Sequence, residues 1–136
     1  MSDTVFSKIV RGEIPAQKLY EDDHVIAILD VGPLSKGHTL VIPKEPAETM
    51  ADLSDPAAAA LGRVLPRIAR ALKKATGAES YNILQNNGES AGQSVMHVHV
   101  HVIPRFDDEG LAMDWQAKNA DSGELEELGR KIARLL

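Results

Sequence analysis

Three histidines alternate with valines in the run His97-Val98-His99-Val100-His101, which continues to Ile103. Successive side chains of an extended strand point to opposite faces. We therefore expect the valines to pack under a helix and the three imidazoles to line the other face, about 6.5 Å apart. A neutral imidazole is a good nucleophile near pH 7, because its reference pKa is about 6.5, provided that its other nitrogen is held as a donor. The run predicts attack by imidazole on phosphorus, with a second histidine as proton donor or phosphate contact.

Two other interpretations of the histidines stay open at this point. One is a half-exposed strand whose polar face happens to be histidine. The other is a metal site, since two histidines at i and i+2 on a strand can ligate zinc or iron. A metal site also needs a carboxylate or a further histidine aimed at the same point. The nearby acidic residues Asp107, Asp108 and Glu109 follow Pro104 and indicate a solvated turn.

A polar loop over residues 86–94 ends where the imidazoles begin. Its glycines let the backbone approach an anion closely, and its amide and hydroxyl donors stabilise a phosphate without net positive charge. Such a loop on its own is also typical of an ordinary protein surface. Next to the histidines it predicts a phosphate cradle, which favours direct imidazole chemistry over the two alternatives.

Short strands and flanking helices are predicted around these residues. A long helix is expected from the Ser54 cap to a stop at Gly77, with a kink at Pro66, and a last amphipathic helix over 122–136. A short helix is predicted over 6–10, and strands over 18–21, 24–29, 39–42, 81–84 and 95–103. The short links between strands predict an α+β fold with a mainly antiparallel sheet.

The chain length of 136 residues suits one compact domain, which we place over residues 1–136. Hydrophobic residues make up 43% and charged residues 26%, which are values of globular proteins. The absence of cysteine excludes disulfides, thiol catalysis and cysteine-bound zinc. A net charge of -5 without a basic run argues against a nucleic-acid partner, and no apolar run suits a membrane span. Since the N-terminus does not resemble a signal peptide, we expect a cytoplasmic protein.

The chain resembles the histidine triad (HIT) superfamily over residues 3 to 105. The alternating histidines match the family signature in full, and Gly92-Gln93-Ser94-Val95 stands where the family has its Gly-Gln-Ser/Thr approach. Residues 6–15, 20–30 and 38–44 resemble its N-terminal segment and first three strands. The resemblance implies a HIT-like fold, with a long helix on an antiparallel five-stranded sheet, and a homodimer with one continuous sheet. Trp115 and the C-terminal helix are candidates for covering either the second subunit or their own core.

The resemblance also implies hydrolysis or transfer at the α-phosphate of a purine nucleotide. His99 would be the nucleophile that forms a nucleotidyl-histidine, His101 would contact the phosphate, and His97 and His38 would support the site. Ser94 or His101 would lie near the leaving group, and Asp30 would hold the ribose hydroxyls. The phosphate-binding residues would be Asn86, Gly92, Gln93 and Ser94. The residues that enclose the base would be Val5, Phe6, Ile9, Ile28 and Val31.

The branch that the chain resembles most is Hint-like, the histidine triad nucleotide-binding proteins. This implies phosphoramidates such as adenosine 5′-phosphoramidate or AMP-lysine as substrates. The alternatives are a dinucleoside polyphosphate hydrolase and a nucleotide-binding protein with little catalysis. Many relatives hold structural zinc on two N-terminal cysteines, a histidine after the third strand and the first histidine of the triad. Thr4, Ser7 and Pro46 stand at three of those places, so we expect no metal and no cofactor.

Overall fold

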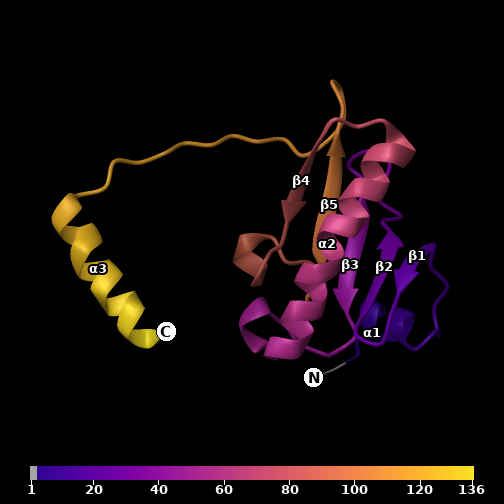
Figure 1. Cartoon of the computed structure of the whole chain (residues 1–136), viewed down its shortest axis with the longest axis horizontal. Helices are drawn as coiled ribbons and strands as arrows, with labels where there is room; N and C mark the ends of the chain where they lie inside the picture. The colour runs from indigo at the N-terminus through magenta and orange to yellow at the C-terminus, as the bar shows by residue number, and fades with distance from the viewer. Residues whose placement is uncertain (1–2) are drawn as a thin grey trace.

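The structure is a computed structural model that describes residues 3–136 (Figure 1). Five strands form one sheet in the order β1-β2-β3-β5-β4, and all neighbouring strands are antiparallel. The strands are β1 (Lys18–Glu21), β2 (Val25–Leu29), β3 (Thr39–Pro43), β4 (Ser80–Leu84) and β5 (Val100–Arg105). The helices are α1 (Val5–Val10), α2 (Asp55–Thr76) and α3 (Ser122–Leu135), with 3-10 turns η1 (Met50–Asp52) and η2 (Glu89–Ala91). The predicted α+β fold with a five-stranded antiparallel sheet is confirmed.

Helix α2 covers one face of the sheet (Figure 1). Its ends follow the predicted signals, because the Ser54 hydroxyl accepts from the Ala57 N–H and Gly77 ends the helix at a φ of 77°. The helix is unbroken at Pro66, which lies on its exposed side. Valines of three strands and of the segment before β5 meet the apolar side of α2, as predicted: Val25, Val41, Val98, Val100 and Val102 lie against Leu61, Val64, Ile68 and Leu72. The histidines are therefore left for the opposite face.

Helix α1 packs on that opposite face. Phe6 is buried there in a second apolar cluster with side chains of β2 and β3: Ile26, Ile28, Leu40 and Ile42. A capping box holds the start of α1, in which the Thr4 hydroxyl accepts from the Ser7 N–H and the Ser7 hydroxyl accepts from the Thr4 N–H. Because α1 is only six residues long, this cap and the burial of Phe6 are what keep it in place.

Strand β5 begins at Val100, so the prediction of a strand over 95–103 was wrong at its start. The preceding residues are held by the segment after β3 instead of by a sheet partner. The Val98 N–H donates to the Ala47 carbonyl at 2.9 Å, and His97 Nε2 lies 2.8 Å from the Pro43 carbonyl. The chain therefore joins the sheet only at Val100, directly after His99, a change that alternation alone does not reveal.

Helix α3 forms where it was predicted, but it does not cover the core of its own chain. None of its residues is buried, and Figure 1 shows it separated from the sheet and α2 by a long extended strap. Of the two predicted roles for the last helix, packing on its own core is therefore wrong. Among residues 3–136, the helices are too short or too polar to cross a bilayer.

Candidate active site

Aromatic rings from α1, from β5 and from the residues directly before β3 and β5 come together on the α1 face of the sheet. The His99 ring packs edge-on against Phe6, with centroids 4.8 Å apart, and against His101, with centroids 5.0 Å apart. The His101 ring lies 5.1 Å from that of His38. His99 and His38 are only 5% and 4% exposed, whereas His101 is half-buried. Three of the predicted histidines thus form one continuous cluster.

The tautomer of His99 follows from its backbone partner. Its Nδ1 lies 2.7 Å from the His97 carbonyl oxygen. A carbonyl can only accept, so Nδ1 carries the proton and the neutral ring keeps a lone pair on Nε2. Because Nε2 is the nitrogen free to react, the backbone before β5 holds His99 as a nucleophile.

His38 and His101 form a chain of directed hydrogen bonds. The Leu34 N–H donates to His38 Nδ1 at 3.0 Å, so neutral His38 carries its proton on Nε2. This Nε2 lies 2.9 Å from His101 Nδ1 and 3.5 Å from an oxygen of Asp30. His101 Nδ1 accepts that proton, which leaves the neutral His101 ring with a proton on Nε2. His101 therefore offers a donor and His99 an acceptor.

Burial keeps these rings neutral. It lowers the pKa of His99 below 6.5, an effect that the bond to the His97 carbonyl partly offsets. It also lowers the pKa of His38, against the opposing charge of Asp30. Burial, together with the neighbouring His99 and His38, lowers the pKa of His101 to about 4. At neutral pH the cluster therefore presents the Nε2 lone pair of His99 beside the Nε2–H donor of neutral His101.

His97 differs in role from the other three histidines. It is 1% exposed, and its Nε2 donates to the Pro43 carbonyl at 2.8 Å. Its Nδ1 has no hydrogen-bond partner within residues 3–136. Its ring lies 6.4 Å from Phe6. The residue anchors the segment before β5, which in turn supplies the carbonyl that orients His99.

An apolar cavity of about 350 Å³ opens beside the reactive rings. All five predicted base-enclosing residues line it: Val5, Phe6, Ile9, Ile28 and Val31. Asp30, Ser94, His99 and His101 line the same cavity, and none of its lining residues is Lys or Arg. The Asp30 carboxylate accepts from the Gly32 N–H at 2.8 Å. The cavity thus joins an apolar slot, one carboxylate and the imidazoles.

Further lining residues were not identified from the sequence. Ile14, Pro15 and Ala16, which follow α1, form part of the cavity wall, as do Leu40 and Val95. Leu40 pairs directly with His101 across β3 and β5, so the sheet register would have revealed it. Residues 14–16 carried no sequence signal beyond the turn after Gly12.

The polar loop before β5 is held together by contacts between its own residues. The Asn86 side-chain amide lies 3.4 Å from the Gly92 carbonyl, across the loop. Gly92 has a φ of 100°, and a Cβ there would lie 3.3 Å from that same amide. Ser94 is exposed and lines the cavity, whereas Gln93 is 3% exposed and is bonded within the protein. Asn86, Gly92 and Gln93 do not line the cavity; of the predicted phosphate-binding residues, Ser94 does.

Two places in the structure come into consideration as metal sites. A cavity of about 260 Å³ is lined by Ser7, Pro46 and His97, which stand at the implied zinc site. The Thr4 and Ser7 hydroxyls bond to each other at 3.1 Å, and proline has no ligand atom. Of the residues at the implied zinc site, His97 is the one zinc ligand of the usual kind, and the Asp3 carboxylate that also lines the cavity is paired with Arg11 at 2.8 Å. These residues therefore do not fit a four-coordinate zinc.

The second place is Asp30, His38 and His101, whose ligand atoms lie within 4.8 Å of one another. Such donors suit zinc. His38 would have to ligate through Nε2, yet the Leu34 N–H occupies the lone pair of Nδ1 and leaves the proton on Nε2. The cluster is better arranged to direct hydrogen bonds than to hold a cation.

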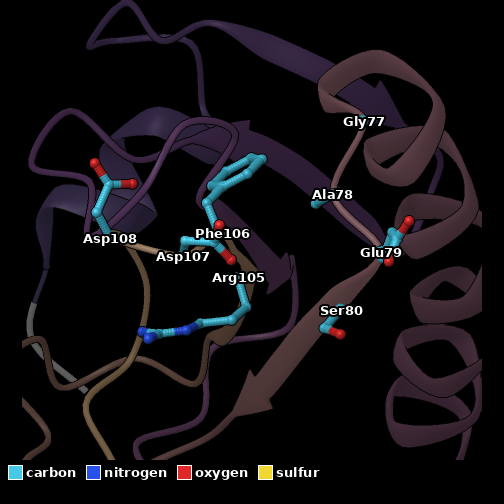
Figure 2. A pocket seen from close by; sticks show the side chains of 8 residues that line it. All are labelled: Gly77, Ala78, Glu79, Ser80, Arg105, Phe106, Asp107 and Asp108. Carbon is cyan, nitrogen blue, oxygen red and sulfur yellow. The ribbon is translucent and has the colours of Figure 1, made fainter.

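A wider hollow of about 570 Å³ lies elsewhere, where α2 leads into β4 and β5 ends (Figure 2). Its lining includes three carboxylates, Glu79, Asp107 and Asp108, with Arg105 and Phe106. Carboxylates repel a phosphate, and the hollow contains no imidazole. It is therefore a poor site for the chemistry that the histidines support.

A family model for the HIT domain matches residues 11–108. The chain belongs to the HIT family. Several curated relatives are enzymes by name. The adenosine 5′-monophosphoramidase hnt1 of Schizosaccharomyces pombe is 46% identical over 130 residues, which cover 95% of both chains. The adenylylsulfatase HINT3 of Arabidopsis thaliana is 50% identical over 104 residues, 76% of this chain but 53% of the relative's length. The predicted Hint-like resemblance is confirmed, and homology supports a HIT-family nucleotide hydrolase.

The fold also agrees with solved structures of the family. The crystal structure of a HIT family member from Bacillus subtilis superposes with a TM-score of 0.94 at 40% identity, covering 99% of this chain and 98% of the other. The match extends over nearly the whole chain, including α3.

Proposed function

We propose that this HIT protein hydrolyses phosphoramidates of nucleoside monophosphates, such as adenosine 5′-phosphoramidate or AMP-lysine, through a nucleotidyl intermediate on His99. The observation that carries the proposal is the fixed tautomer of His99, whose Nδ1 lies 2.7 Å from the His97 carbonyl. Binding alone does not require a nucleophile held in this way. The name of the Schizosaccharomyces pombe relative, an adenosine 5′-monophosphoramidase, supports the same reaction class.

In the first step the Nε2 lone pair of His99 attacks the α-phosphorus, and the bond from phosphorus to the leaving nitrogen breaks. The His101 N–H and the Ser94 hydroxyl line the same cavity as His99 and can donate to the phosphate or hand a proton to the departing amine. In the second step water attacks the phosphorus, releases the nucleoside monophosphate and restores both His99 and the donated proton. Neutral donors thus stabilise the charge that develops on the phosphate.

The remaining residues bind and orient the nucleotide. The Asp30 carboxylate accepts hydrogen bonds from the ribose hydroxyls, and the apolar cavity beside α1 encloses a purine base. His38 keeps His101 in the tautomer that points a donor at the phosphate. Because no step needs a Lewis acid, we propose that turnover requires no metal or other cofactor.

The test is release of AMP from adenosine 5′-phosphoramidate in excess EDTA. Wild type should turn over, and His99→Ala should lose at least about a thousandfold of kcat. The matched control is His24→Ala, because His24 is exposed and outside the site. Turnover that survives His99→Ala would mean that another group is the nucleophile.

Two further measurements separate the alternatives. The alternative enzyme is a dinucleoside polyphosphate hydrolase, so diadenosine triphosphate is the competing substrate. A large preference for it would contradict the phosphoramidate proposal. Micromolar AMP binding by calorimetry, without turnover of either substrate, would instead indicate a nucleotide-binding protein.

A further inference from the structure

The loop between β2 and β3, residues 30–38, carries two side chains of the candidate active site, Asp30 and His38. The Asp30 N–H closes the base of the loop by donating to the His38 carbonyl at 2.9 Å. Within the loop the His38 N–H donates to the Ser35 carbonyl at 3.1 Å, and the Leu34 N–H donates to the His38 ring at 3.0 Å. The nitrogen on which His38 carries its proton therefore depends on how this loop is folded.

Only one side chain between the two ends of the loop is buried. Among residues 31–37 this is Ser35, which is 3% exposed, whereas Val31 and Leu34 are 101% and 49% exposed. A loop whose apolar side chains face water gains little from packing, so other contacts have to hold its conformation. A buried hydroxyl is costly unless it is hydrogen-bonded, so Ser35 is the residue to supply such a contact.

The Ser35 hydroxyl ties the loop to strand β5. It donates to the Pro104 carbonyl at 2.6 Å, and both residues are buried. Strand β3 begins at Thr39, which pairs with Val102, so within residues 3–136 no strand continues this pairing beyond Val102. The serine thus takes the place of a strand partner at the end of β5. Without its hydroxyl a buried carbonyl would lose a donor.

A second hydrogen bond ties the same loop to the segment after β5, but it is exposed. The Lys36 N–H donates to the Glu109 carboxylate at 3.2 Å, and both residues face solvent. Water can replace either partner of an exposed hydrogen bond, so losing this bond costs little, whereas an unpaired buried carbonyl is costly. The bond of Ser35 is therefore the one that we expect to hold the loop.

We infer that Ser35 is a positioning residue of the active site: by holding the Leu34 N–H against His38, it sets which nitrogen of that ring carries the proton. Through His38 it also sets the tautomer of His101, whose Nδ1 lies 2.9 Å from His38 Nε2. Ser35 does not line the cavity, so it is not placed to touch the nucleotide. Its effect on turnover rests on the proposed function, whereas its effect on the tautomers does not.

The consequence of losing this turn follows from the two nitrogens of each ring. Without the Leu34 N–H, neutral His38 can carry its proton on Nδ1, and its Nε2 then becomes an acceptor. His101 would have to donate to that nitrogen through its own Nδ1, which leaves a lone pair on His101 Nε2. This lone pair would face the phosphate where a donor is needed. The Asp30 oxygen 3.5 Å from His38 Nε2 favours the active tautomer, so we expect a partial loss of the donor.

The effect on turnover is measured with Ser35→Ala and adenosine 5′-phosphoramidate. We expect kcat/KM to fall at least about fivefold, because part of the His101 rings would present no donor to the phosphate. Ser35→Cys fills similar space but donates weakly, so its kcat/KM should lie between those of wild type and Ser35→Ala. The controls are Ser80→Ala, at an exposed serine, and Glu109→Ala, which removes the exposed bond to the same loop. Each control should stay within about twofold of wild type.

A double-mutant cycle with His101→Gln separates positioning from a general loosening of the fold. If Ser35 acts through the His101 donor, Ser35→Ala should lower kcat/KM by less than about twofold once His101 is already glutamine. A merely structural role would lower kcat/KM by the same factor in both backgrounds. Equal factors would therefore overturn the inference, as would a loss in Glu109→Ala as large as that in Ser35→Ala.

Nuclear magnetic resonance of the imidazole nitrogens reads the tautomers in the free protein, without turnover. A nitrogen that carries a proton resonates apart from one that carries a lone pair, so the two tautomers of His38 can be told apart. At neutral pH wild type and Glu109→Ala should carry the His38 proton on Nε2, and Ser35→Ala should show a mixture. His99 should be the same in all three proteins, because the His97 carbonyl holds its Nδ1.

The nitrogen spectra and the kinetics fail independently of each other. A His38 ring that keeps its proton on Nε2 in Ser35→Ala would overturn the inference, even if wild type hydrolyses adenosine 5′-phosphoramidate as proposed. If wild type did not hydrolyse this substrate, the proposed function would fail, and the spectra would still decide whether Ser35 sets the tautomer of His38. A mixed tautomer together with a loss that disappears in the His101→Gln background is the result that we expect.

Discussion

The histidines of this site differ in function because their second nitrogens have different partners. His99 donates through Nδ1 to a backbone carbonyl, whereas His101 accepts through Nδ1 from His38. One ring is thereby left with a lone pair on Nε2 and the other with a proton there. Identical side chains two residues apart become a nucleophile and a donor. The distinction depends on the backbone at Leu34 and His97, not on the histidines themselves.

The acid side of the pH profile should report the protonation of His99. Burial lowers the pKa of this ring below 6.5, and protonation removes the Nε2 lone pair. We therefore expect kcat/KM for adenosine 5′-phosphoramidate to stay constant from pH 8 to below 6.5 and to fall only at lower pH. The measurement is a kcat/KM profile in buffers of constant ionic strength. A midpoint at pH 7 or above would contradict the neutral cluster.

At the scale of the elements, the spacing of apolar residues together with capping and stop residues predicted most of the fold. The Ser54 cap, the Gly77 stop and the apolar spacing between them locate α2 almost to the residue, and the alternating valines do lie under it. These signals are local, so they can be read from the sequence. The beginning of β5 and the bonds of Gln93 could not be predicted in this way, because both depend on residues 47 and 48, about 50 positions away.

The turn before β3 shows how tightly one element is fitted against the others. Gly37 has a φ of 89°, and a Cβ there would lie 2.8 Å from a methyl of Thr76 in α2 and 3.4 Å from Pro104 in β5. Gly37→Ala should therefore destabilise the protein by about 1–3 kcal/mol, measured as a change in urea unfolding. Gly12→Ala is the control, since it has a φ of 77° but no atom within 4 Å.

If Gly37→Ala destabilised the protein no more than Gly12→Ala, backbone conformation alone would account for the effect. A larger loss at Gly37 would show that the close approach of three elements matters. Because His38 follows directly, we also expect kcat/KM to fall more in Gly37→Ala than in Gly12→Ala.

At the scale of the whole molecule, the two faces of the sheet have different functions. The α2 face supplies most of the apolar core, while the α1 face buries imidazoles that burial keeps uncharged. Keeping titratable rings neutral has a consequence for folding, because the unfolded chain binds protons at a higher pH than the folded one. The active site should therefore make the protein less stable in mild acid.

Stability should fall as the pH decreases from about 6.5 to 4. In that window the unfolded histidines become protonated, while His101, with a folded pKa of about 4, stays neutral. Because the pKa of His101 is about 4 in the folded protein and about 6.5 in the unfolded chain, this ring lowers the free energy of unfolding by about 3 kcal/mol as the pH falls through that window. Carboxylates contribute in the same sense but mostly at lower pH. The pKa values of Asp3, Glu21, Asp22 and Glu45 are lowered, so their stabilisation is fully present above the ordinary carboxyl pKa values and is lost as the pH falls below them.

Urea unfolding at pH 7, 6, 5 and 4.5, at one protomer concentration, measures this effect. The free energy of unfolding should depend less on pH in His101→Gln than in wild type, because the glutamine has no proton to gain. His24→Gln removes an exposed histidine and should keep the wild-type slope. If His101→Gln also kept that slope, the acid sensitivity would arise from groups other than His101. A shallower slope would show that the neutral imidazoles required for catalysis also make folding pH-dependent.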